Sequence, residues 1–146
     1  MLTGFTGNWT GSNRLFFEGA DGPVLESPSK LTATMVISGF LQVHYDWVYE
    51  GKPKEGLLLV GDDAGPGVVT ASFVDSFHSS QRVMYFQGAR LANGVSVKGS
   101  YTVGDGPEWG WRIDLELDGA ELRLTMYNVS PEGVEYLAVL AVYQRG

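Results

Sequence analysis

The residues best suited to chemistry in this sequence stand close together at Asp75, Ser76 and His78. A carboxylate, a hydroxyl and an imidazole are the residue types of a hydrolytic triad. Successive side chains of a strand point to opposite faces, however, so Ser76 and His78 are expected to share a face that Asp75 does not. A polar strand end is therefore favoured over a triad, and Asp75 and His78 are expected to orient the polar end of a ligand.

Metal and cofactor chemistry have little support in the sequence. His44 and His78 are the two histidines, and there is no cysteine. His44 alternates with aromatic residues and is expected to point away from them. A lone histidine beside carboxylates falls short of the three protein ligands that a catalytic zinc ion usually has. The sequence predicts no metal and no cofactor, and it disfavours haem.

A second set of candidate residues is aromatic. The residues expected to share inward faces are Tyr45, Trp47, Tyr49, Trp109 and Trp111. The intervening positions carry charged side chains such as Asp46 and Arg112, which belong on a solvated face. Buried Tyr and Trp need partners for their polar atoms, so a filled core would more simply use Leu, Ile and Val. Aromatic residues mixed with methionines such as Met126 favour a cavity for a flat or apolar ligand, with a filled core as the alternative.

Extended segments must position these residues, because the dominant pattern is an alternation with a period of two. Strands are expected over 6–17, 30–50, 56–61, 68–77, 81–89, 95–103, 109–117, 121–129 and 134–145. Ser38-Gly39 is expected to bend the long segment into two strands. Asn93-Gly94, Asp118-Gly119 and the four residues 130–133 are hairpin turn signals. Segment 18–29 is rich in glycine and proline and predicts an irregular loop without a helical lid.

About ten short-linked strands predict an all-β protein with a single up-and-down antiparallel β-barrel. Closure is expected because it pairs both edge strands and encloses one core. A two-sheet sandwich is the alternative, and it is disfavoured because Greek-key crossovers need longer connections. The length of 146 residues suits one domain that spans residues 1–146.

Composition excludes several classes of partner. The net charge is -7, and the basic residues form no cluster, so binding to nucleic acid is not expected. There is no charged segment followed by an apolar run and no apolar run of about twenty residues, so neither a secretion signal nor a membrane span is predicted. The absence of cysteine is compatible with a reducing compartment, and a cytoplasmic location is expected.

The two ends of the sequence resemble the calycin superfamily of lipocalins, fatty-acid-binding proteins and avidins. In that superfamily a Gly-x-Trp motif on the first strand is covered by a late arginine, and Gly7, Trp9 and Arg145 match this arrangement. The resemblance implies that Trp9 and Arg145 close one end of the barrel. Segments 109–112 and 126–133 are also similar to a bacterial lipocalin-like family that is catalogued as a domain of unknown function. This similarity spans nearly the whole chain and implies a fold but no activity.

A more distant resemblance is to the nitrobindins, which are ten-stranded haem-binding barrels. Their opening motif is Gly-x-Trp-x-Gly-x-Gly, and Gly7, Trp9 and Gly11 match it. Asn13 stands in place of the third glycine. This departure disfavours haem.

The predicted function is the binding of a small hydrophobic or aromatic molecule inside the barrel, as a carrier or sensor that needs no catalysis. The expected ligand-binding residues are Tyr45, Trp47, Asp75, His78, Trp111, Met126 and Asn128. The alternative is a barrel enzyme of decarboxylase, isomerase or hydrolase type, with Asp75, His78 and Arg112 as acid, base and anion clamp. Alternation sends Arg112 outward, and a bulge at Gly110 would be needed to turn it inward.

The last strand is apolar on both faces over residues 137–142. One face fills the barrel, and the other needs a cover. A second copy of the chain is the expected cover, which predicts a homodimer, whereas loop 18–29 is the alternative. A structural dimer with a filled core is the third functional hypothesis.

Overall fold

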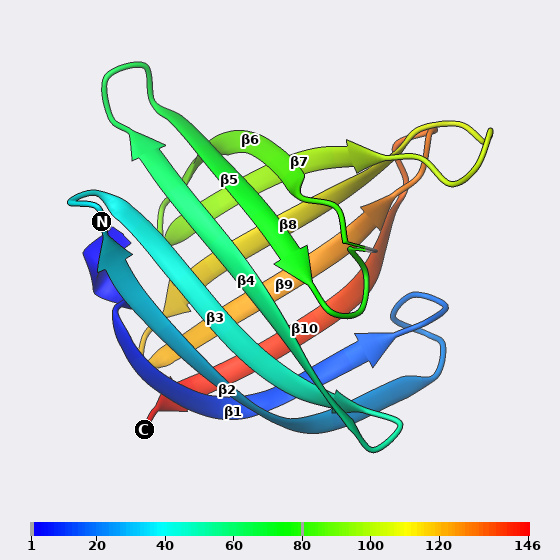
Figure 1. Cartoon of the computed structure of the whole chain (residues 1–146), viewed down its shortest axis with the longest axis horizontal. Helices are drawn as coiled ribbons and strands as arrows, with labels where there is room; N and C mark the ends of the chain where they lie inside the picture. Colours follow the sequence, from blue (N-terminus) through cyan, green and yellow to red (C-terminus); the bar gives the residue numbers. More distant parts are fainter. Residues whose placement is uncertain (1, 80) are drawn as a thin grey trace.

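The computed structural model describes residues 2–79 and 81–146 and shows a closed barrel of ten antiparallel strands (Figure 1). The strands are β1 (Gly7–Phe16), β2 (Val24–Val36), β3 (Phe40–Tyr49), β4 (Lys52–Asp63), β5 (Val68–Asp75), β6 (Met84–Leu91), β7 (Gly94–Tyr101), β8 (Trp109–Asp118), β9 (Glu121–Val129) and β10 (Glu135–Arg145). Each strand pairs with its neighbour in sequence, and β10 returns to pair with β1. The predicted fold class is confirmed.

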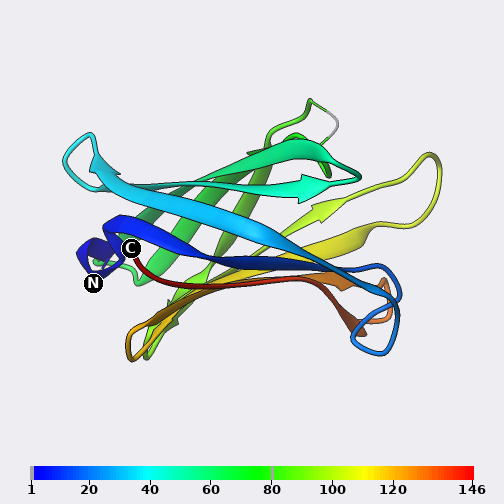
Figure 2. The ribbon, with the colours of Figure 1, turned by 90° about the horizontal axis from the view of Figure 1, so that it is seen from below.

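One short 3-10 helix, η1 (Leu2–Phe5), precedes the first strand. Within the described part of the chain, no helix has the length and apolar character needed to cross a membrane. Both termini lie at the same end of the barrel (Figure 2).

The alternation on β3 shows why the sequence forms a barrel with one core. Leu41, Val43, Tyr45 and Trp47 are buried, whereas the residues between them are exposed or half-buried. The inward residues of the other strands join them in one continuous apolar cluster. The bend at Ser38-Gly39 separates β2 from β3, as predicted.

The prediction of an irregular loop over 18–29 is wrong in its second half. The loop ends at Pro23, and β2 begins at Val24. Proline 28 is tolerated inside this strand because β3 pairs with β2 only from Leu31 onward, so Pro28 lies where β2 has one ladder neighbour.

Helix η1 covers the end of the barrel where the termini lie. The indole N–H of Trp9 donates to the carbonyl of Phe5 at 2.9 Å. The guanidinium of Arg145 lies 4.1 Å above the Trp9 ring and donates to the carbonyls of Thr6 and Gly4 at 2.8 and 2.9 Å. These contacts tie the start and the end of the chain together over the core.

Two glycines of the opening motif, Gly7 and Gly11, lie where neighbouring atoms leave no room for a Cβ. Gly7 has a φ of 135°, and a Cβ there would lie 2.8 Å from Nη1 of Arg145. A Cβ on Gly11 would lie 1.8 Å from the carbonyl oxygen of Val142 on β10. The motif therefore serves the contact between β1, β10 and the closing arginine.

Candidate functional site

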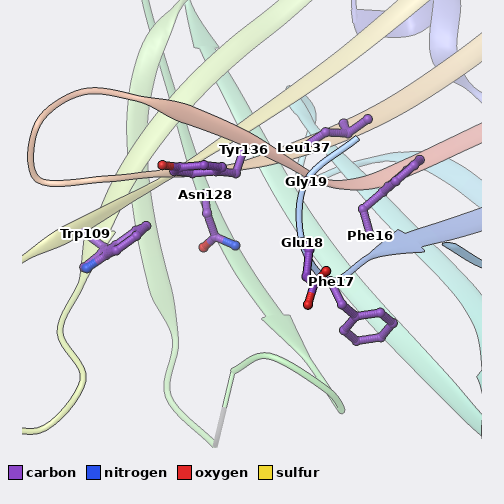
Figure 3. A pocket seen from close by; sticks show the side chains of 8 residues that line it. All are labelled: Phe16, Phe17, Glu18, Gly19, Trp109, Asn128, Tyr136 and Leu137. Carbon is purple, nitrogen blue, oxygen red and sulfur yellow. The ribbon is translucent and has the colours of Figure 1, made fainter. Parts of the chain in front are cut away.

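A pocket of about 300 Å³ opens at the end of the barrel opposite η1 (Figure 3). It lies between the loop that follows β1 and the ends of β8, β9 and β10. The residues that line it are Phe16, Phe17, Glu18, Gly19, Trp109, Asn128, Tyr136 and Leu137. Its volume is at the small end of the range for ligand pockets.

The pocket has aromatic walls and one central amide. The rings of Trp109 and Tyr136 lie 6.4 Å apart, and Phe17 borders the opening from the β1 side. In Figure 3 the side chain of Asn128 lies between Trp109 and Glu18. The hydroxyl of Tyr101 donates to Oδ1 of Asn128 at 2.6 Å, which orients the amide and leaves the Nδ2 donors for another partner.

A second polar feature of this end is the pair formed by Asp75 and His78. Strand β5 ends at Asp75, and Oδ1 of its buried carboxylate accepts from the backbone N–H of His78 and from those of Phe77 and Ser79 at 3.1 and 2.8 Å. Oδ2 contacts Nδ1 of His78 at 2.6 Å. The turn thus places the imidazole against the carboxylate, with Nε2 directed away from it.

The carboxyl group of Asp75 is held in its ionised form. Burial raises its pKa, but the hydrogen bonds and charge of His78, together with the backbone N–H groups, outweigh burial and leave the pKa below its ordinary value. An ionised carboxylate on Nδ1 fixes the orientation of the imidazole. This arrangement could bind a ligand's polar group or transfer a proton at Nε2.

The directions in which Asp75, Ser76 and His78 point differ from the directions that strand alternation predicts. Ser76 and His78 were expected to share a face without Asp75, but the strand ends at Asp75 and a turn replaces the alternation. The hydroxyl of Ser76 contacts the backbone of Glu55 on the neighbouring strand instead, accepting from its N–H at 2.9 Å. Ser76 is therefore engaged in pairing the strands, and the triad stays disfavoured.

An aromatic arc joins the Asp75–His78 pair to the barrel interior. The imidazole lies 5.1 Å from the ring of Trp111 and 4.7 Å from that of Phe77. Phe77 in turn packs edge-on against Trp47 at 6.2 Å, and Trp47 stacks on Tyr45 at 5.3 Å. The arc therefore runs from β3 across the turn after β5 to β8.

The structure divides the predicted ligand-binding residues into three groups. Asn128 lines the pocket, and Asp75 and His78 form the pair at the end of β5. The remaining four are buried in the interior: Tyr45, Trp47, Trp111 and Met126. Trp111 connects the groups, because it contacts His78 and is the direct cross-strand partner of Asn128.

Sequence reasoning missed Tyr136 as a pocket residue for a physical reason. Simple alternation from Val139 would place Tyr136 on the outer face with Leu140. A register shift between Leu137 and Val139 reverses the facing, so Tyr136 opposes Asn128 across the ladder. Phe17 and Glu18 were missed because they lie beyond the strand, where periodicity carries no signal.

Four buried side chains have polar atoms without a hydrogen-bond partner among the described residues. They are the indole Nε1 atoms of Trp47 and Trp111, both amide atoms of Asn13 and Nε of Arg112. Asn13 shares the inward face of β1 with Trp9 and Leu15, whereas Arg112 lies on the outer face of β8. Buried polar groups normally find partners, so the three inward side chains are candidates for ligand contacts.

Arg112 lies on the outer face, as its alternation indicates, and therefore away from the Asp75–His78 pair with which the alternative hypothesis grouped it as an anion clamp. Its guanidinium contacts the carboxylates of Asp114 and Glu135 at 3.4 and 3.0 Å and lies 4.2 Å over the ring of Tyr127. Gly110 keeps the regular ladder with β9, so no bulge turns Arg112 inward.

The side chains that could bind a metal ion do not cluster anywhere in the described residues. His44 is half exposed and contacts Glu55 at 2.6 Å on the outer face. Across residues 2–79 and 81–146, no group of three or more His, Cys, Asp or Glu side chains could hold a metal ion.

The outer face of β8 to β10 carries a groove of about 500 Å³. It is lined by Glu116, Glu121, Arg123, Thr125, Tyr127, Leu137, Leu140 and Val142. Leu140 and Val142 are the outward apolar residues of the last strand, and no residue of loop 17–23 lines this groove. A homodimer through this strand stays a prediction.

These features define a class of protein, a closed up-and-down β-barrel of ten strands with an aromatic pocket at its open end. The chain belongs to the family described as "Protein of unknown function (DUF1579)", which matches residues 1–145. None of the curated proteins matches the sequence. The crystal structure of Rv2717c from M. tuberculosis is similar to this barrel, with a TM-score of 0.70 and 16% sequence identity over 99% of this chain and 94% of that chain. At this identity the likeness concerns the fold alone.

Proposed function

We propose that the barrel binds a small apolar or aromatic molecule at its open end, as a carrier or sensor. The pocket at that end carries the proposal, because Phe17, Trp109 and Tyr136 provide apolar walls around the amide of Asn128. Ligand sites characteristically combine apolar walls with a few placed polar groups. The resemblance to the calycins supports the same function, since lipocalin barrels hold one small ligand.

The dimensions and polar groups of the pocket favour a compact ligand. A volume of about 300 Å³ suits a molecule of one or two rings better than a long chain. The Nδ2 donors of Asn128 would bind a hydrogen-bond acceptor on that molecule.

The indole N–H signals of the protein provide a site-resolved test. The four tryptophans give four signals in nitrogen-15 NMR spectra, which Trp→Phe variants assign. Titration with neutral naphthalene derivatives is expected to shift the signal of Trp109 saturably and to leave that of Trp9, at the closed end, in place. Trp109→Ala is expected to weaken binding about tenfold or more, because an aromatic wall is lost.

The matched control is Tyr85→Ala, which removes an exposed aromatic ring on β6 that does not line the pocket. Equal affinities of Trp109→Ala and Tyr85→Ala, or the absence of saturable binding across the naphthalene series, would contradict the proposal.

A second candidate function is proton-transfer catalysis at His78. The contact of Nδ1 with the ionised Asp75 favours it, because an oriented imidazole is a common general base. Turnover that is abolished in both His78→Gln and Asp75→Asn, with ligand affinity retained, would support an enzyme. Binding without turnover in the native protein favours the carrier.

A further inference from the structure

We infer that the ligand is a neutral molecule whose inner end carries a carbonyl-type hydrogen-bond acceptor, and that Trp47, Trp111 and Asn13 recognise this end inside the barrel. The inference rests on the proposed function and names the chemistry of its ligand. The recognising atoms are the two indole Nε1 donors and the Asn13 amide.

The three side chains come from three separate strands and point into one interior. Asn13 on β1, Trp47 on β3 and Trp111 on β8 are 1%, 2% and 5% exposed. Each occupies an inward position in the alternation of its strand. None of the unpartnered atoms can reach bulk water without movement of the protein.

Leaving these atoms without partners is costly. An unsatisfied buried donor or acceptor costs about 1–3 kcal/mol, and phenylalanine would fill most of the volume of an indole without that cost. Two other polar groups of the interior are paired, because the indole of Trp9 donates to a carbonyl and the hydroxyls of Ser29 and Tyr143 lie 2.7 Å apart. A further unpartnered atom, Nε of Arg112, belongs to a side chain on the outer face that contacts two carboxylates. Among the described residues, the unpartnered polar atoms that face the interior are those of Trp47, Trp111 and Asn13.

Trp111 lies beside the pocket at the open end, and none of the three side chains is among the residues that line this pocket. Trp111 is the direct cross-strand partner of Asn128, and both side chains lie on the inner face. Directly opposed residues have Cβ atoms about 5 Å apart, so Trp111 is the first of the three side chains that the inner end of a molecule held at Asn128 would meet. Trp47 lies beyond Phe77 and His78 on the same aromatic arc.

Asn13 can contribute both kinds of hydrogen bond. Its ladder neighbours are Ser27 on β2 and Ala141 on β10, which are both small. The hydroxyl of Ser27 already accepts from the backbone N–H of Val48 at 3.0 Å. The amide of Asn13 is therefore left to donate to, and accept from, a bound molecule.

The charges of the barrel favour a neutral acceptor over a carboxylate. The ionised Asp75 lies at this end of the interior, and Glu18 lines the pocket. Within the described residues, Arg14, Arg90, Arg112 and Arg123 contact carboxylates, and Arg145 covers the closed end. Arg82 lies on the loop after β5 and is not among the residues that line the pocket. An anionic group in the pocket would therefore meet like charge without an arginine in the lining, whereas a carbonyl accepts from N–H donors without that repulsion.

A matched pair of probes tests the inference on the full chain. Methyl naphthyl ketone and isopropenylnaphthalene, substituted at the same ring position, have nearly the same shape, but only the ketone accepts hydrogen bonds. The ketone is expected to bind about tenfold or more tightly in calorimetry. It is also expected to shift the indole proton signals of Trp47 and Trp111, which the hydrocarbon does not shift by hydrogen bonding.

Variants identify the atoms responsible. Trp47→Phe and Trp111→Phe are expected to lower the affinity for the ketone toward that of the hydrocarbon and to leave hydrocarbon binding unchanged. Trp109→Phe, which alters a wall of the pocket, is expected to affect both probes alike. Both interior variants are expected to keep or raise the melting temperature, because each removes an unsatisfied donor.

Two outcomes would overturn the inference and leave the proposed function standing. One is equal affinity for the two probes with no dependence on Trp47→Phe or Trp111→Phe. The other is a crystal structure of the ketone complex in which ordered water, and not the carbonyl, meets the indole N–H groups. If neither probe binds, both proposals fail together.

Discussion

The carboxylate of Asp75 binds His78 at two points, through the backbone N–H on Oδ1 and through Nδ1 of the ring at 2.6 Å from Oδ2. Ser79 contacts Asp75 in both directions. Its backbone N–H donates to Oδ1 of Asp75, and its hydroxyl accepts from the backbone N–H of Asp75 at 2.8 Å. One buried side chain therefore folds the turn and sets the orientation of the imidazole against Trp111. The stability of this turn and the geometry of the open end are linked through Asp75.

Replacement of Asp75 by asparagine is expected to destabilise the protein by about 1.5–3 kcal/mol, because Oδ1 is retained but the charged contact with His78 is lost. Urea unfolding followed by circular dichroism measures the change. Asp105→Asn makes the same substitution in an exposed turn and is expected to have an effect within about 0.5 kcal/mol. Equal effects of the two substitutions would show that the pair does not stabilise the turn.

The same pair predicts a loss of stability in acid. The pKa of Asp75 is lowered in the folded protein from its ordinary value of 3.8, so its ionised form stabilises the fold above that value. This contribution is lost as the pH falls from about 3.8 through the lower folded pKa. The difference in unfolding free energy between the native protein and Asp75→Asn is expected to shrink in that window. A constant difference from neutral pH to pH values below the window would contradict the assignment.

Arg145 and Trp9 are expected to stabilise the closed end. Arg145→Met removes two hydrogen bonds to carbonyls and the contact with the Trp9 ring, and it is expected to cost about 1–3 kcal/mol in urea unfolding. Arg14→Met breaks an exposed ion pair with Glu26 and is expected to cost no more than about 1 kcal/mol. Equal losses of unfolding free energy in Arg145→Met and Arg14→Met would contradict this role of Arg145 and would indicate that η1 alone covers the core.

Gly11 is expected to be intolerant of any side chain. A Cβ there would overlap the carbonyl oxygen of Val142, so Gly11→Ala forces β1 and β10 apart and is expected to cost about 3 kcal/mol or more. Gly39→Ala is the matched control, because a Cβ at Gly39 meets nothing within 4 Å and its φ is not in the left-handed region. Soluble yield and melting temperature distinguish them, and similar values for the two variants would contradict the close approach.

The sequence was sufficient for the fold because alternation and turn chemistry act locally. The residues of β3 have the predicted facing, and the ten strands follow the predicted order. The candidate site was harder, because it lies where the alternation stops. Asp75 and His78 meet through a turn, and Tyr136 faces the pocket only because the register shifts before Val139. A local pattern does not reveal either event.

Asn13 is a second residue whose role could not be predicted from the local sequence pattern. In the sequence it is a departure from a glycine motif, and only the closed barrel shows that its amide is buried without a partner among residues 2–79 and 81–146. Asn13→Leu keeps a similar volume and removes both unpaired atoms, so it is expected to stabilise the protein by about 1–3 kcal/mol. Asn13→Asp is the opposing control, because it buries a charge at the same position and is expected to destabilise strongly near neutral pH.

The value of Asn13→Leu lies in measuring stability and binding together. If the amide recognises a ligand, the variant gains stability in urea unfolding and loses affinity for methyl naphthyl ketone, which is the trade-off expected where a binding site carries unsatisfied groups. If Asn13 has no role in recognition, the variant gains the same stability, because the unpaired atoms are removed, but its affinity for the ketone is unchanged. A loss of stability in Asn13→Leu would show that the amide has partners in the folded protein, and Asn13 would then have no role in recognition.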